Sequence, residues 1–234
     1  MPAPSLQNLV PAERARRIDD VIARMRGIAT RLPAHDGVAA FNELYLAVTE
    51  DVAAGVPRGF EDPAFVRRLD VAFANLYFDA LRAKRVPAAW APLFEARGRR
   101  GILPIQFALA GMNAHINRDL PVALARTCAA RRVDLRGSSP QHRDFRRVDK
   151  LLAKTEARVK RSFASGLVGV ADVALGRVDD VLAMWNVERA REAAWVNAET
   201  LATLRAVPPL RTEFLRTLDR MVGFAGRGLL RPLA

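Results

Sequence analysis

Two polar pairs interrupt an otherwise apolar stretch of the chain and could form a chemical site. His115 and Asp119 are four residues apart, and so are Asn113 and Asn117. Residues four apart lie on one face of a helix, so the Asp119 carboxylate can orient the His115 imidazole. An imidazole held in this way acts as a general base or as a metal ligand. We therefore take His115, Asp119, Asn113 and Asn117 as candidate catalytic residues.

The same four residues also fit a structural role. Burying polar groups costs free energy unless each finds a partner, and a cluster with all its partners can fix how helices pack. Two hypotheses therefore stay open. The protein is either an enzyme acting on a polar small molecule by acid–base or metal-assisted chemistry, or a non-enzymatic helical scaffold or binding protein with a structural polar block.

A further histidine, His142, lies beside Asp144 in the first turn of an expected helix. Two histidines with nearby carboxylates can ligate a divalent metal ion, which makes His115, Asp119 and His142 candidate metal ligands. The spacing matches no common metal motif, since both His-Glu-x-x-His and a cysteine pair are absent from the sequence. The candidate cofactor is therefore a divalent metal of unspecified identity.

Two earlier stretches place amides, acids and phenols beside apolar positions. Glu43 and Tyr45 lie in one stretch, Asn75 and Tyr77 in the other, and the chain has only these two tyrosines. Each tyrosine falls on an apolar stripe, so its hydroxyl either faces a shared polar centre or lies at the rim of the core. On the first alternative, the four residues line a pocket for a small-molecule ligand.

The elements that must position these residues are helices. Apolar residues recur at steps of three and four, as on one face of a helix. Strict alternation of apolar and polar residues over the length of a strand is absent. We expect a first helix to open at Pro11, a later one at Asp62-Pro63, and a weaker one over residues 167–185. Pro104 opens a long central helix that carries the polar pairs and bends at Pro121, because proline cannot donate to the preceding turn.

The predicted fold class is all-α, with one domain of about eight or nine helices. We expect this domain to cover residues 11–234, after an N-terminal tail of residues 1–10. No apolar run reaches the roughly 18 to 20 residues that span a bilayer, so we expect no transmembrane segment. The start of the sequence has no basic segment followed by an apolar one, so we also expect no secretory signal.

The formal net charge of this 234-residue chain is +12, and Cys128 is its only cysteine. A single cysteine excludes an intramolecular disulfide and fits a reducing cytoplasm. The basic residues are spread along the chain and interrupted by acids, which favours a solvated basic surface over a nucleic-acid groove. We therefore expect no nucleic-acid partner, and the sequence leaves the oligomeric state open.

Four stretches of the chain resemble a known family. They are residues 41–45 (FNELY), 70–79 (DVAFANLYFD), 110–121 (AGMNAHINRDLP) and 142–149 (HRDFRRVD). Together they resemble the bacterial domain-of-unknown-function family 5995 over most of the chain, and the Asn-Ala-His-Ile-Asn block is the most specific part. The resemblance implies a bacterial helical protein and supplies no reaction.

Overall fold

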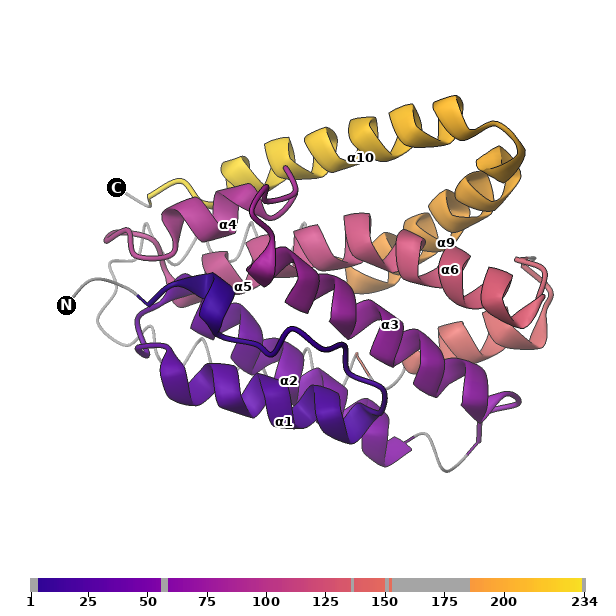
Figure 1. The fold of residues 1–234 in the computed structure, drawn as a ribbon, viewed down its shortest axis with the longest axis horizontal. Helices are drawn as coiled ribbons and strands as arrows, with labels where there is room; N and C mark the ends of the chain where they lie inside the picture. The colour runs from indigo at the N-terminus through magenta and orange to yellow at the C-terminus, as the bar shows by residue number, and fades with distance from the viewer. Residues whose placement is uncertain (1–3, 56–58, 136, 150–151, 153–185, 233–234) are drawn as a thin grey trace.

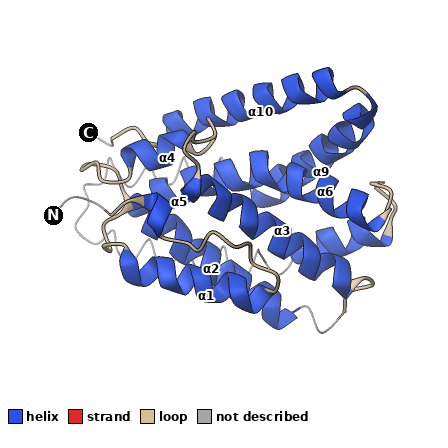
Figure 2. Ribbon diagram, in the orientation of Figure 1, coloured by secondary structure: helices blue, strands red, loops and turns tan. Residues whose placement is uncertain are grey.

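The computed structural model describes residues 4–55, 59–135, 137–149, 152 and 186–232. Every regular element in these ranges is a helix, and no strand occurs among them (Figures 1 and 2). The all-α prediction is therefore confirmed. The expected helix over residues 167–185 lies outside the described residues. None of the described helices is both long and apolar enough to cross a membrane.

Eight labelled α-helices and three short turns make up most of the described chain, and residues 140–149 are also helical. The α-helices are α1 (Ile18–Arg31), α2 (Gly37–Gly55), α3 (Pro63–Arg82), α4 (Ala91–Ala96), α5 (Pro104–Ala114), α6 (Leu120–Arg131), α9 (Val187–Thr203) and α10 (Pro208–Leu229). The turns are η1 (Leu6–Asn8), η2 (His115–Asp119) and η3 (Leu204–Ala206).

The helices are arranged around α3 and the α5–α6 region (Figure 1). On one side, α1 packs on α2 and α2 packs on α5. On the other side, α9 packs along α6, and the chain then turns back so that α10 lies over α4 and α5. The helix α3 contacts both α1 and α6, and therefore connects the two sides.

The helix α3 begins where the sequence predicts a helix start, and the helix α1 does not. Asp62 Oδ1 accepts a hydrogen bond from the backbone N–H of Phe65 at 2.9 Å, which caps α3 as expected. The helix expected from Pro11 begins only at Ile18. Asn75 explains the difference, because its side chain bonds both the N–H and the C=O of Ala15 at 2.9 Å. These tertiary hydrogen bonds replace the ones a local helix would supply.

The expected central helix is divided into three parts. It runs as α5, then as a π-helical turn at η2, then as α6. Pro121 has no N–H, and its ring would clash with the carbonyl of Asn117 four residues earlier in a regular α-helix. The wider π turn includes Asn117 and ends at Asp119, two residues before this proline. His115 and Asp119 are therefore the first and last residues of a π turn.

Buried apolar side chains form two clusters that meet near the middle of α3. The first cluster gathers side chains from α1, α2, α4, α5 and the second half of α3. The second gathers side chains from the first half of α3, α6, α9 and Phe145 of the helix over residues 140–149. Phe73 and Met112 pack against both clusters. The boundary between the clusters therefore lies next to η2.

The first ten residues, expected as a tail, contribute to this packing. Leu9 and Val10 are buried in the first cluster, directly after η1.

Candidate functional site

His115 and Asp119 are brought together as their spacing predicts. His115 Nδ1 lies 3.1 Å from Asp119 Oδ2, and the side chains are 1% and 0% exposed. The same carboxylate accepts hydrogen bonds from Trp90 Nε1 at 3.0 Å and from Arg118 Nη1 at 2.6 Å. Three donors from two parts of the chain therefore hold Asp119 in place behind the imidazole.

The His115 imidazole is neutral, with its free nitrogen at Nε2. Burial lowers the pKa of His115, and the hydrogen bond and charge of Asp119 only partly oppose this effect. Because the Asp119 carboxylate accepts from Nδ1, the proton of the neutral ring is on Nδ1. Nε2 then carries the lone pair, and it is buried without a hydrogen-bond partner among the described residues.

Aromatic rings fix the orientation of the imidazole. Phe73 stacks on it with ring centroids 3.5 Å apart and an angle of 6° between the planes. Tyr45 approaches the imidazole edge-on, with centroids 4.5 Å apart. The imidazole is therefore held by packing as well as by Asp119, and it has little freedom to turn Nε2 elsewhere.

A cavity of about 70 Å³ lies beside His115, at the boundary between the two apolar clusters. Its volume is several times the ~10–15 Å³ that one water molecule needs. Apolar side chains form most of its wall, namely Val48, Val52, Phe65, Val66, Leu69, Phe73, Met112, Ile116, Leu120, Phe145, Val148 and Leu152. The polar lining residues are Tyr45, Asp70, His115 and Arg191.

Two of these polar residues carry buried atoms without partners. Neither Asp70 Oδ2 nor the Tyr45 hydroxyl makes a hydrogen bond within the described residues. Thr49, one turn after Tyr45, donates to the Tyr45 backbone carbonyl instead. Burial raises the pKa of Asp70 to about 7 and raises the pKa of Tyr45 well above its usual value. At neutral pH, Asp70 therefore exchanges a proton readily and Tyr45 keeps its own.

Arg191 is the cationic group of the cavity wall. Its Nε pairs with Asp149, its Nη2 donates to the Phe145 carbonyl at 2.8 Å, and its guanidinium lies 4.0 Å from the centroid of the Phe145 ring. Burial lowers the pKa of Arg191 and raises the pKa of Asp149, while each partner's charge opposes the shift. The third nitrogen, Nη1, has no partner among the described residues.

The two predicted amides lie on the side of α5 and η2 that contacts α10. Asn113 Nδ2 donates to the backbone carbonyl of Val222 at 2.9 Å. Asn117 Nδ2 donates to Asn113 Oδ1 at 3.0 Å. Neither side chain lines the cavity. The structure therefore separates the amide pair from the His115–Asp119 pair.

Of the four predicted ligand-binding residues, only Tyr45 lines the cavity. Glu43 is exposed, and Asn75 is occupied by the backbone of Ala15. Tyr77 is buried among aromatic rings and stacks on Trp90, with its hydroxyl unpartnered within the described residues.

The predicted metal ligands do not come together. His142 lies 3.7 Å from a Glu192 oxygen and packs against Trp195, and its backbone N–H is capped by Ser139. Within the described ranges, no group of three His, Cys, Asp or Glu side chains is placed to hold a metal ion. His115, Asp119 and His142 therefore do not form such a group.

Sequence reasoning missed Asp70 and Arg191, although the spacing carried a signal for both. Asp70 shares a face of α3 with Val66 and Phe73, four residues before it and three after. Arg191 falls among the apolar positions of α9 and is only 6% exposed, so its charge lies on the buried face of this helix. A charged residue at an apolar position of a helix could have indicated that the helix contributes to a buried polar site.

Comparison with known proteins gives a family and no activity. No curated protein matches the chain, and no solved structure matches it. Residues 18–232 match the family described as "Family of unknown function (DUF5995)", and this range includes the helix α1, the cavity wall and all of α10. Since the match spans nearly the whole sequence, the chain belongs to family DUF5995.

Proposed function

We propose that the protein is an enzyme that performs general acid–base chemistry on a small molecule in the cavity, with His115 as the base. The proposal rests on one observation: His115 Nε2 is buried, unpartnered among the described residues, and belongs to a side chain that lines the cavity. A buried polar atom without a partner costs about 1–3 kcal/mol, and folded proteins keep few of them. A ligand that supplies the missing partner explains why this one is kept.

Asp119 prepares His115 for proton abstraction. It holds the proton of the neutral imidazole on Nδ1 and leaves the Nε2 lone pair directed away from the carboxylate. When Nε2 takes a proton from the substrate, the new positive charge forms on a ring whose other nitrogen lies 3.1 Å from Asp119. The carboxylate stabilises that charge without taking up the proton itself.

Asp70 and Tyr45 supply the complementary roles. With a pKa of about 7, Asp70 is partly protonated at neutral pH and can return a proton to the substrate. Tyr45 stays protonated, so its hydroxyl can donate a hydrogen bond to an oxygen that gains negative charge. Both groups line the same cavity as His115.

The wall of the cavity selects a small, uncharged substrate with an apolar body. Asp149 already neutralises Arg191, and the imidazole is neutral, so a second anion would gain little attraction and would lose its hydration. Nη1 of Arg191, which has no partner among the described residues, can still donate to a carbonyl or hydroxyl oxygen of the substrate. Small ketones, esters and epoxides combine these properties.

The test compares wild type with His115→Gln. A panel of small neutral ketones, esters and epoxides is incubated with each protein in D₂O, and conversion or hydrogen exchange is followed by proton NMR. We expect wild type to convert at least one compound and H115Q to be at least ~100-fold slower, as for loss of a general base. His35→Gln is the matched control, because His35 is an exposed histidine outside the cavity. Equal rates for wild type and H115Q would refute the proposal.

A second candidate function, a scaffold or non-enzymatic binding protein, is favoured by the amide pair. Asn113 and Asn117 form a hydrogen-bonded link to α10, which is what a structural polar block provides. On this hypothesis, H115Q changes stability and leaves no activity to lose. Compounds that bind wild type without any conversion or exchange would support it over the enzyme.

A further inference from the structure

A second hollow lies where α9 turns into α10, and it shares no lining residue with the His115 cavity. Its volume is about 730 Å³. The end of α6, the loop that follows it, the end of α9 and the start of α10 supply its wall. We call it the arginine hollow, after the four arginines that line it: Arg126, Arg132, Arg205 and Arg211.

The four guanidinium groups of the arginine hollow form no ion pair with an acidic side chain among the described residues. Ion pairs occupy many other arginines of the chain, for example Arg131 with Asp62 and Arg216 with Glu213. None of the four arginines takes part in such a pair with a described carboxylate. Among the described residues of the lining, Asp134 is the only acidic one, so positive charge dominates this part of the hollow.

The positive charges are close enough to disturb one another. Burial lowers the pKa of Arg126, and the charges of Arg14, Arg118 and Arg211 lower it further, while the charge of Asp79 opposes this shift. Holding like charges together costs free energy, and a bound anion removes that cost.

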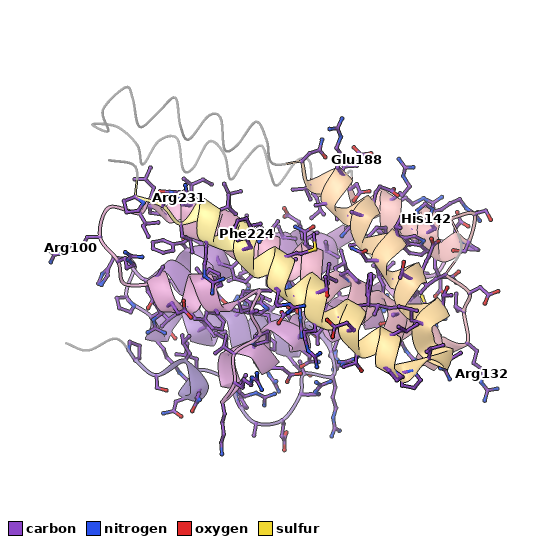
Figure 3. The ribbon with its side chains drawn as sticks, turned by 90° about the horizontal axis from the view of Figure 1, so that it is seen from above. Arg100, Arg132, His142, Glu188, Phe224 and Arg231 are labelled. Atoms are coloured by element: carbon purple, nitrogen blue, oxygen red, sulfur yellow. The ribbon has the colours of Figure 1, made fainter. Side chains whose placement is uncertain are left out.

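Arg132 shows a second unfavourable feature at the same place. It ends α6 with a left-handed backbone, φ 54° and ψ 39°, and it is the only non-glycine residue with positive φ in the described chain. Glycine is the usual residue in this conformation, and a side chain there costs roughly 1–2 kcal/mol. Figure 3 places Arg132 at the end of the molecule where α9 and α10 meet. The guanidinium of Arg132 therefore lines the arginine hollow although its backbone conformation is energetically unfavourable.

Apolar side chains complete the wall between the arginines. Leu201 and Cys128 are buried, and Val133 and Leu135 are partly buried. Burial raises the pKa of the Cys128 thiol to about 11, so this side chain behaves as an apolar group at neutral pH. The hollow therefore offers contact to an apolar group as well as to an anion.

We propose that the arginine hollow binds a small phosphorylated molecule that carries an apolar or aromatic group. Guanidinium groups donate paired hydrogen bonds to phosphate oxygens, and several of them can share one phosphate. The apolar part of the ligand packs on Leu201, Val133 and Leu135. A hollow lined by several elements suits a compact ligand, whereas a nucleic-acid strand needs an extended groove with stacking aromatic residues.

Isothermal titration calorimetry at low ionic strength tests the proposal with phenyl phosphate and inorganic phosphate. We expect phenyl phosphate to bind more tightly, because only it carries an apolar group. Arg126→Ala and Arg211→Ala should each weaken its binding at least ~10-fold, as for loss of a charged hydrogen bond. Arg211→Lys, which keeps the charge and the fold, should retain part of the affinity.

The matched control is Arg220→Ala, which removes an exposed arginine of α10 that pairs with Glu213. It should leave the affinity for phenyl phosphate unchanged. Absence of binding to wild type, or equal losses in R126A, R211A and R220A, would overturn the proposal. Tighter binding of a short single-stranded RNA, lost in the same two variants, would replace the small ligand with nucleic acid. None of these outcomes depends on catalysis at His115.

Discussion

Unpaired polar atoms are concentrated at the His115 cavity. His115 Nε2, Asp70 Oδ2 and the Tyr45 hydroxyl are all buried and lack partners among the described residues. Each carries a desolvation cost that an apolar side chain would avoid. Residues that lower stability while lining a cavity are the expected signature of a functional site, where selection tolerates local conflicts.

We therefore expect the Asp70 carboxyl group to lower the free energy of unfolding while it serves the site, and Asp70→Asn tests this expectation. The folded-state pKa of about 7 exceeds the ordinary value of 3.8, so the folded protein holds this proton more tightly than the unfolded chain does. Stability is consequently lost as pH rises from about 4 to 7, and it changes little above pH 7. We expect D70N to raise the free energy of unfolding by about 1–3 kcal/mol at pH 7 and much less at pH 4.

Urea denaturation of wild type and D70N between pH 4 and 8 measures this difference. Glu213→Gln on exposed α10 is the control and should show no such trend. A gain for D70N that shrinks as pH rises would contradict the assignment. In the proposed enzyme, the same variant should lose turnover while it gains stability.

At the scale of elements, α10 supports the site from outside the cavity. Its Asp219 accepts hydrogen bonds from the N–H groups of Ala88 and Ala89, and lies 3.4 Å from Arg118. Arg118 in turn donates to Asp119, the residue that orients His115. The position of α10 is therefore linked to the imidazole through an unbroken series of polar contacts.

Gly223 allows this close approach of α10, and Gly223→Ala tests it. A Cβ atom at Gly223 would overlap the backbone carbonyl of Ala88, which cannot move aside as a flexible side chain could. We expect G223A to lower the free energy of unfolding by about 1–3 kcal/mol, the usual cost of overpacking.

Gly228→Ala is the matched control in the same helix. A Cβ atom there meets nothing within 4 Å, so the substitution should stabilise α10 by up to ~1 kcal/mol through helix propensity. Urea denaturation of both variants gives the comparison. Shifts of the same sign would show that Ala88 does not limit the approach of α10.

At the scale of the whole molecule, the site lies where two apolar clusters meet. Phe73 and Met112 belong to the packing of both clusters, and both line the cavity. Interiors are close-packed, and joining two separately packed clusters is one way to leave a cavity between them. Function would then reside at the boundary, while each cluster supplies stability.

The segment before α1 should contribute to this stability through Asn75. We expect Asn75→Ala to lower the free energy of unfolding by about 1–3 kcal/mol, because the N–H and C=O of Ala15 lose their partner. Hydrogen exchange by mass spectrometry should show faster exchange over residues 9–16. Glu43→Ala, at an exposed position, is the control and should change neither quantity. Unaltered exchange over residues 9–16 in N75A would contradict the structural role of Asn75.

Sequence rules that depend on neighbouring residues predicted much of the fold, and they predicted the arrangement of one of the two polar pairs in full. The cap at Asp62 and the His115–Asp119 contact follow from spacing alone, because both join residues within one turn of helix. Spacing also predicted the Asn113–Asn117 pair, but it could not reveal that α10 would occupy Asn113. That contact joins residues more than a hundred positions apart.

The sequence by itself determined the helical class, the starts of α3 and α5 and the pairing of His115 with Asp119, since each depends on neighbours a few residues away. Only the tertiary structure decided which polar residues share a cavity. It added Asp70 and Arg191 to Tyr45 and His115, and it assigned Asn75 to the backbone of Ala15. The physical reason is that burial and partner choice depend on contacts between distant helices, which the period of one helix does not encode.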